Sequence, residues 1–225
     1  MEDEGVEQIV VFDFDKTITS IDTFTRLIVY LINQSLWRQC LALVLLPLIF
    51  FLNTFHASKP YAVSIGLWIA SVGENRRCLV KRIKCYAERH KALGTHDVMR
   101  KRAFYSIKLH LALGHRVVIV SASSRSWIKH MLGPVLSAKV TIIGSRLQFR
   151  WQGLVLKSWC YGKNKLDHFV SYDVPQQNLR TIYSDSLTDI ALMERARNRC
   201  FVNLSSELQK NLETSGAFYY LTWSY

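Results

Sequence analysis

The sequence predicts an α/β fold, in which a mostly parallel sheet is interrupted by one long helical insert. Short apolar runs recur along the chain, and most are followed by a segment with helical periodicity. Such alternation is typical of parallel sheets, whose buried strands are almost continuously apolar. The stretch from about residue 20 to residue 104 has no convincing buried strand and shows helical patterns instead.

Four apolar runs are the candidate strands. The second and third lead into predicted helices over 121–132 and 187–198, which places these two strands in βα units. A further segment, 141–156, alternates apolar and polar residues around glycines and predicts an antiparallel hairpin beside the core. The predicted strands cover residues 9–14, 117–120, 179–184 and 200–204.

Composition narrows the class of protein. The chain has 225 residues, and the apolar share of 49% is ample for a packed core and excludes a disordered chain. The formal net charge of +12 favours an anionic partner, although four acids fall within the first eight residues. Five cysteines without CxxC spacing predict neither a disulfide framework nor a zinc site, so a reducing compartment is expected.

The middle of the insert is unusually apolar. Residues 40–52 contain no polar side chain, and as a helix they would extend roughly 20 Å, short of the ~30 Å core of a bilayer. A second apolar stretch, 61–72, follows a polar turn. Three interpretations of residues 36–72 stay open: two buried helices, a helical hairpin that enters one leaflet, or a transmembrane span over about 36–55.

A basic segment follows the apolar one. Between residues 76 and 102 there are ten Lys or Arg and two acids, and Leu79, Ile83 and Tyr86 fall on one helical face. A basic amphipathic helix of this kind suits an anionic lipid surface, and it equally suits a solvated helix on a basic protein.

Four carboxylates follow two of the predicted strands. Asp13 and Asp15 are two apart, so an extended chain points both the same way. Asp185 and Asp189 have the four-residue spacing that places two residues on one face of a helix. Open α/β sheets hold ligands at the carboxyl ends of their strands. Four carboxylates gathered there would repel one another without a cation, and such oxygen ligands suit Mg²⁺.

The order of these motifs resembles the haloacid dehalogenase (HAD) superfamily. DxDxT after a strand, Ser121 after a strand, Lys165, and DxxxD after a strand follow one another between residues 9 and 204. The resemblance implies a Rossmann-like core from 1–19 and 106–225, with residues 20–105 as an inserted helical C1 cap. Lys16 and Ser184 depart from the pattern, because many members have Gly at these positions.

Several shorter segments are similar to particular subgroups of this superfamily. The SAS tripeptide (121–123), the hairpin and YGKNK (161–165) look like subfamily IB, the phosphoserine-phosphatase-like group. The apolar start of the insert, CYGKNK (160–165) and YSDSLTD (183–189) are most similar to the bacterial phosphatidylglycerophosphatase C type.

The resemblance implies a chemical role for each motif. Asp13 would attack phosphorus and form an aspartyl-phosphate, and Asp15 would act as general acid and then general base. Lys163 is the alternative to Lys165, which we favour because the family places this lysine at the start of the following helix. The implied phosphate-binding residues are Thr17, Ser121, Ala122 and Lys165, and the implied Mg²⁺ ligands are Asp13, Asp15 through its carbonyl, Asp185 and Asp189.

Three functions are compared on these grounds. The favoured one is dephosphorylation of a membrane lipid phosphomonoester such as phosphatidylglycerophosphate, because the insert is both apolar and basic. The alternative is a soluble phosphatase of a small metabolite such as phosphoserine. Nucleic-acid binding is disfavoured, since no helix-turn-helix, zinc pattern or RNP-like motif occurs. The expected partners are a phosphorylated substrate and an anionic membrane surface, and the expected location is the bacterial cytoplasm or the cytoplasmic face of the inner membrane.

Overall fold

A seven-stranded sheet forms the centre of the molecule, in the order β4-β3-β2-β1-β5-β6-β7. The computed structural model describes residues 7–92, 98–212 and 218–223, so the acidic residues Glu2, Asp3 and Glu4 lie outside the described residues. Neighbouring strands are parallel except for the antiparallel pair β3 and β4. The predicted α/β class is therefore confirmed. The strands are β1 (Ile9–Phe12), β2 (Arg116–Ser124), β3 (Thr141–Arg150), β4 (Gly153–Ser158), β5 (Leu179–Ser184), β6 (Asn198–Val202) and β7 (Tyr219–Leu221).

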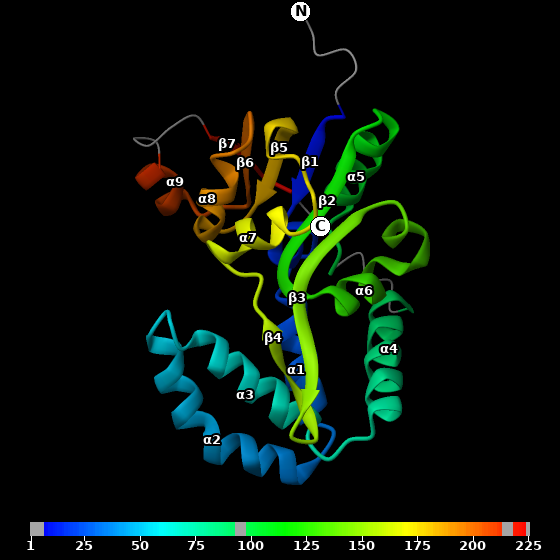
Figure 1. The fold of residues 1–225 in the computed structure, drawn as a ribbon, viewed down its shortest axis with the longest axis vertical. Coiled ribbons are helices and arrows are strands. Elements are labelled where there is room, and N and C mark those ends of the chain that lie inside the picture. Colours follow the sequence, from blue (N-terminus) through cyan, green and yellow to red (C-terminus); the bar gives the residue numbers. More distant parts are fainter. Residues whose placement is uncertain (1–6, 93–97, 213–217, 224–225) are drawn as a thin grey trace, which may run out of the picture.

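Helices cover both faces of this sheet (Figure 1). The alternating side chains of β1 explain the two layers: Val10 and Phe12 belong to one apolar core with α5 and α6, while Ile9 and Val11 belong to a second with α7 and α8. The helices of the core are α5 (Lys101–Ala112), α6 (Arg125–Ser137), α7 (Asn164–Val170), α8 (Ile190–Met193) and α9 (Ser206–Leu212).

Two predicted helices have other bounds in the structure than the sequence suggested. β2 continues through Ser124, so the helix expected from residue 121 starts as α6 at Arg125. The helix expected over 187–198 is reduced to a 3₁₀ turn, Leu187–Asp189, and the short α8. Asp185 therefore precedes the helical turn that contains Asp189, and the prediction that both lie on one helical face is wrong.

Among the residues that the structure describes, the insert has four helices, and they lie at the carboxyl end of the sheet (Figure 1). α2 and α3 pack against each other, and α4 lies against α6, on the other side of α1 and the β3–β4 hairpin. Leu79 and Ile83 pack into the core, as their spacing predicts. The predicted cap boundary at residue 105 falls inside α5, which contacts β2. The helices of the insert are α1 (Thr23–Ile32), α2 (Leu36–Thr54), α3 (Lys59–Ser71) and α4 (Arg76–Ala92).

The predicted hairpin of residues 141–156 is present as β3 and β4, and it connects the sheet to the insert. The Leu154 amide donates to Ser71 Oγ of α3 at 2.6 Å, and the Leu156 amide donates to Ser64 Oγ at 3.3 Å. At the tip, Trp68 Nε1 donates to the Trp151 carbonyl at 2.9 Å. These bonds fix α3 against the outer edge of the sheet.

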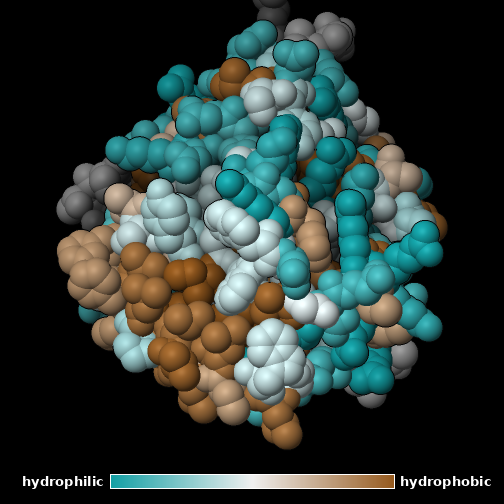
Figure 2. All heavy atoms as spheres, turned by 60° about the horizontal axis from the view of Figure 1, so that its bottom comes forward, coloured by the Kyte–Doolittle hydropathy of each residue, from teal (hydrophilic) through white to brown (hydrophobic). Residues whose placement is uncertain are grey.

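Helix α2 is largely uncovered. It is the one helix among the described residues that is long and apolar enough to cross a membrane, with a mean hydropathy of 1.7 and 6% of that stretch buried. Figure 2 shows a continuous hydrophobic area on this part of the surface. The interpretation of two buried helices is therefore wrong for α2, while α3 is buried along one side. We call the following residues, each more than half exposed, the α2 face: Leu36, Leu43, Val44, Leu46, Phe50 and Phe51.

Candidate active site

Asp13 lies directly after the central strand β1. Its amide donates to the Tyr183 carbonyl of β5 at 2.9 Å, which extends the parallel pairing by one residue. Its carboxylate is at the carboxyl edge of the sheet, where Lys165 Nζ donates to Oδ1 at 2.9 Å. After Asp13 the chain turns away through Phe14–Ile18, and Lys16 adopts a positive φ of 61°.

Lys165 is buried between two carboxylates. Its Nζ is 2.9 Å from Asp13 Oδ1 and 2.7 Å from Asp189 Oδ2, and Ser184 Oγ donates to the same Asp189 oxygen at 2.7 Å. Lys163, two residues earlier, is exposed, so of the two lysines in GKNK it is Lys165 that lies beside Asp13. Ser184 thus has a definite contact with Asp189.

Asp15 points away from Asp13, toward the first turn of α1. Its Oδ1 accepts bonds from both the amide and the hydroxyl of Thr23, each at 2.7 Å, and its Oδ2 accepts a short bond from Ser123 Oγ. The buried Trp127 Nε1 donates to Thr23 Oγ1 at 2.9 Å. Because an indole nitrogen only donates, the Thr23 hydroxyl hydrogen is directed to Asp15.

Thr17 and Asp185 bind each other. The Asp185 amide donates to Thr17 Oγ1 at 2.9 Å, and this hydroxyl lies 3.1 Å from Asp185 Oδ1. Thr17 is completely buried, so its side chain holds Asp185 at the strand end and is not free to face a phosphate. The predicted phosphate-binding role of Thr17 is therefore replaced by a contact with Asp185.

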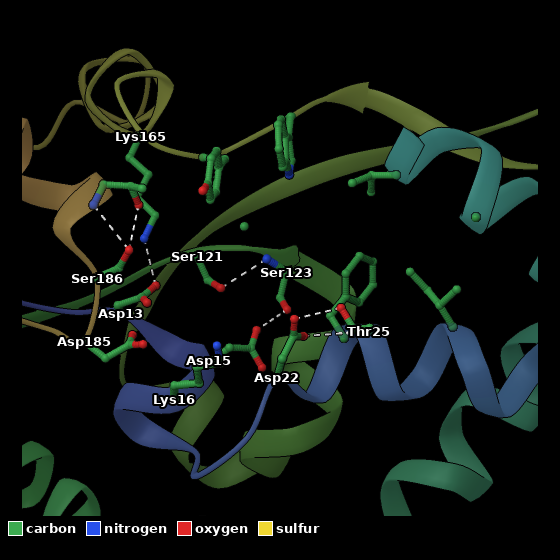
Figure 3. Close-up of a pocket in the computed structure, with 18 of the residues that line it drawn as sticks. Asp13, Asp15, Lys16, Asp22, Thr25, Ser121, Ser123, Lys165, Asp185 and Ser186 are labelled. Carbon is green, nitrogen blue, oxygen red and sulfur yellow. Dashed lines mark hydrogen bonds and ion pairs between the residues drawn. The ribbon is translucent and has the colours of Figure 1, made fainter. Parts of the chain in front are cut away.

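A cavity of about 370 Å³ opens in front of these residues, between the sheet edge and the insert. Figure 3 shows Asp13, Lys165 and Asp185 together at one end of it. We call it the catalytic cavity. The predicted residues that line it are Asp13, Asp15, Ser121, Ala122, Lys165 and Asp185, while Thr17 and Asp189 lie behind them.

The opposite wall of the catalytic cavity is largely apolar, although Asp22, Thr25 and Asn53 of the insert also line the cavity. This wall is formed by α1 and α3, so the cavity has a charged end at the sheet and an apolar side at the insert. The residues of this wall are Phe24, Ile28, Ala62, Val63 and Gly66.

Burial raises the pKa of three carboxylates that line the cavity, those of Asp13, Asp15 and Asp185. Burial raises the pKa of Asp13 well above 3.8, against the attraction of Lys165 and with repulsion from Asp189 and Asp185. Burial also raises the pKa of Asp185, and it raises the pKa of Asp15 from 3.8 to about 6 although Ser123 and Thr23 donate to it. Burial by itself would lower the pKa of Lys165, but Asp13 and Asp189 outweigh this and raise it. Clustered groups of this kind are typical of functional sites.

The residues fit one Mg²⁺ ion held by few protein ligands. Asp13 and Asp185 present carboxylates to the cavity, and Asp189 Oδ1 is buried with no hydrogen-bond partner among the described residues. Within those residues no three His, Cys, Asp or Glu side chains are placed to share one ion. Mg²⁺ is commonly bound by one or two carboxylates, with water and substrate phosphate completing its shell. The predicted fourfold carboxylate cluster is thus a pair, with Asp15 and Asp189 engaged elsewhere.

Several residues of the site were not predicted. Thr23 and Ser123 hold Asp15, and Ser123 carried a signal, because it is two residues after Ser121 in an extended segment. No signal in the sequence pointed to Thr23 or Trp127, because their contacts depend on how α1 and α6 pack. Trp159 and Tyr161 stack at 4.4 Å and line the catalytic cavity beside Lys165.

A match to a protein-family model shows which family the chain belongs to. The model of haloacid dehalogenase-like hydrolases matches residues 10–194, which include both strand-end aspartate pairs. The chain belongs to the haloacid dehalogenase-like hydrolases. The predicted superfamily and the prediction of a hydrolytic enzyme are thereby confirmed. No match was found among curated proteins.

Solved structures share the fold of this HAD hydrolase. A protein of unknown function from Bordetella pertussis Tohama I has a TM-score of 0.73 at 15% identity, covering 96% of this chain and 99% of that one. The phospho-aspartyl intermediate analogue of phosphoserine phosphatase has a TM-score of 0.54 at 14% identity, covering 91% and 90%. A probable phosphoserine phosphatase from Vibrio cholerae has a TM-score of 0.60 at 14% identity, covering 96% and 60%.

Proposed function

We propose that this HAD hydrolase is a Mg²⁺-dependent phosphatase that works through an aspartyl-phosphate and acts on a lipid phosphomonoester. The observation that carries the reaction is the pairing of Asp13 with buried Lys165 at the charged end of the catalytic cavity. A carboxylate held there by an ammonium group is a nucleophile beside a cation that would bind the phosphoryl oxygens.

Each residue has a defined task in this proposal. Asp13 attacks phosphorus, and the bond to the leaving oxygen breaks. Asp15, held by Thr23 and Ser123, gives its proton to that leaving oxygen. In the second step the same Asp15 carboxylate takes a proton from the water that hydrolyses the aspartyl-phosphate. Ser121 and the backbone at Ala122 line the cavity where they would donate to phosphoryl oxygens.

Asp13, Asp185 and the Asp15 carbonyl would hold the ion in this proposal. Bound Mg²⁺ would offset the repulsion between the carboxylate nucleophile and the phosphate. Asp185 is kept in place for this by Thr17.

The lipid assignment is supported by the shape and chemistry of the insert. The cavity wall opposite Asp13 is largely apolar, as an amphipathic substrate requires, and α2 contributes Asn53 to the same cavity. The α2 face next to it is exposed, and residues 36–72 contain no acid. Such a face suits insertion into the apolar edge of a membrane. Phosphatidylglycerophosphate is the substrate we propose, with an anionic membrane surface as the partner and the cytoplasmic face of a bacterial inner membrane as the location.

A soluble phosphomonoester is the second candidate. Two of the structures that share this fold are described as phosphoserine phosphatases. The catalytic cavity is also small enough to enclose a compact substrate at its charged end.

Phosphate release from a panel of substrates tests the proposal. We expect Mg²⁺-dependent release to be fastest from phosphatidylglycerophosphate in mixed micelles, slower from phosphoserine, and lost in Asp13→Asn. The matched control is Asp173→Asn, which changes an exposed aspartate whose positive φ of 50° suits asparagine. Full activity in Asp13→Asn would overturn the mechanism, and faster release from phosphoserine would select the soluble alternative.

A further inference from the structure

A second cavity of about 720 Å³ adjoins the catalytic cavity. The two share Trp159, Tyr161 and Thr188 in their linings, so they lie side by side on the protein surface. Its remaining walls come from the α2–α3 turn, the start of α7 and the α8 region. None of the roles assigned above uses this cavity.

Stacked rings form the wall between the two cavities. Trp159 and Tyr161 lie 4.4 Å apart with an interplanar angle of 10°, and His56 of the α2–α3 turn meets Tyr161 edge-on at 6.4 Å. A flat aromatic wall offers contact to an extended apolar chain at little entropic cost, because the rings are already ordered against each other.

The lining of the second cavity is mainly apolar. Its charged side chains, Lys163 and Glu194, are exposed and belong to its rim. His56, Asn164 and Thr188 also belong to the lining, but an apolar chain lying along the apolar residues would be removed from water. The apolar residues of the lining are Ala57, Pro60, Trp159, Leu187, Ile190 and Ala191.

The second cavity is also continuous with the exposed apolar surface of the insert. Its wall at the α2–α3 turn lies between Phe55 and Tyr61, whose side chains are 57% and 66% exposed. A chain that leaves an apolar phase at the α2 face would therefore reach the rings before it reaches Lys165.

We propose that the second cavity is a subsite for the apolar chain of the substrate's leaving group, with the phosphate held in the catalytic cavity. This inference rests on the proposed function, because it assigns the two ends of one phosphomonoester to the two cavities. It names the substrate class as phosphomonoesters whose leaving group carries an extended alkyl or acyl chain.

Binding of n-alkylphosphonates, measured by titration calorimetry with Mg²⁺ present, tests the subsite without requiring turnover. Chains from ethyl to octyl keep the probe monomeric. We expect the Kd of the unmodified protein to fall roughly tenfold for every two methylenes that the cavity buries. A Kd that is constant along the series would overturn the subsite.

Two variants locate the effect. Ala57→Phe fills the cavity from the exposed turn and Ala191→Phe fills it from α8, and both should flatten the dependence on chain length while leaving the Kd of ethylphosphonate unchanged. Ala138→Phe makes the same change at an exposed position that lines neither cavity, and should keep the full dependence. An undiminished dependence in both cavity variants would place the chain elsewhere and overturn the proposal.

Hydrolysis of the matching alkyl phosphates separates the subsite from the reaction. We expect kcat/KM to rise with chain length in the unmodified protein and to stay constant in Ala57→Phe. If binding follows chain length but no phosphate is released, the proposed reaction fails and the subsite stands. If phosphate is released without any effect of chain length on rate or binding, the reaction stands and the subsite fails.

Discussion

Asp15 is the residue whose surroundings are most completely specified. Both of its oxygens accept hydrogen bonds, and the donors come from three elements: Thr23 of α1, Ser123 of β2 and, through Thr23, Trp127 of α6. A general acid must meet the leaving oxygen in one orientation, so this network sets the geometry of proton transfer.

Thr23→Val removes the hydroxyl while keeping the shape of the side chain. We expect kcat to fall about tenfold to a hundredfold, because a misplaced acid is costly, with KM little changed. Thr23→Ser should restore most of kcat. Thr54→Val, which removes an exposed hydroxyl of α2 that lines neither cavity, serves as control. A fall in thermal stability that accounts for the whole loss, or no rescue by serine, would contradict a positioning role.

Asp15→Asn should stabilise the protein while abolishing activity. The folded-state pKa of about 6 exceeds the ordinary value of 3.8, so the folded protein binds this proton more tightly than the unfolded chain does. Ionisation of Asp15 therefore destabilises the folded protein. This destabilisation is absent below pH 3.8, grows as pH rises to 6 and is constant above pH 6. It reaches about 3 kcal/mol, at about 1.4 kcal/mol per pKa unit.

Urea denaturation in EDTA at pH 5 and pH 8 measures this effect. The stability gain of Asp15→Asn should be larger at pH 8 than at pH 5. An equal gain at both pH values would contradict the raised pKa of Asp15.

Single residues could be predicted where their position depends on their own segment of the sequence, and not where it depends on contacts with distant segments. Asp13 and Asp185 could be predicted because each directly follows an apolar strand, and strand ends meet at one edge. Thr17 was expected to bind phosphate, yet it binds Asp185, 168 residues away, which the sequence of neither segment indicates. Asp189 likewise turns to Lys165 because the expected long helix is a short 3₁₀ turn.

Among the elements, the β3–β4 hairpin determines how the insert is attached. Ser71→Ala would leave the Leu154 amide without its 2.6 Å acceptor at a fully buried serine, and an unsatisfied buried donor costs about 1–3 kcal/mol. We expect a clear fall in Tm. Ser64→Ala, which removes the longer 3.3 Å bond from Leu156, should lower Tm less. The reverse order of the two variants would contradict this attachment.

Strands were predicted more accurately than helices for a physical reason. Buried parallel strands such as β5 are marked by continuous apolar runs, and the expected and observed ranges of β5 coincide at residues 179–184. The apolar run 40–52 did not define the length of α2, because polar residues at both ends, including Arg38, are helical too. β7 has three residues and no predicted counterpart, since so short a run carries no periodicity.

At the scale of the molecule, the α2 face predicts membrane association. The double variant Val44→Glu with Phe50→Glu should reduce binding to anionic liposomes at least ~10-fold in cosedimentation, because two exposed apolar contacts become charged. Hydrolysis of a soluble phosphomonoester should be unchanged, since neither residue lines a cavity.

Val135→Glu is the matched control. Val135 is 74% exposed, as Val44 is, but lies on α6 and away from the α2 face. Equal loss of binding in this variant, or liposome binding that survives the double variant, would contradict a role for α2.

The whole-molecule arrangement also changes how the charge is interpreted. The basic segment adjoins the apolar one in sequence, but in space α4 lies against α6, and Glu74 links it to α2 by contacts with Arg82 and Arg38 at 3.3 Å each. Figure 2 shows hydrophilic side chains beside the hydrophobic area and not over it.

The attachment of α3 to β4 has a consequence for aggregation. β4 is the outermost strand, and the amides of Leu154 and Leu156 point away from β3 into the position where another strand could pair. An unprotected edge of this kind is a template for pairing between chains. The serines of α3 occupy it with side-chain oxygens, so the insert that shapes the cavity also keeps the sheet of one molecule from extending into the next.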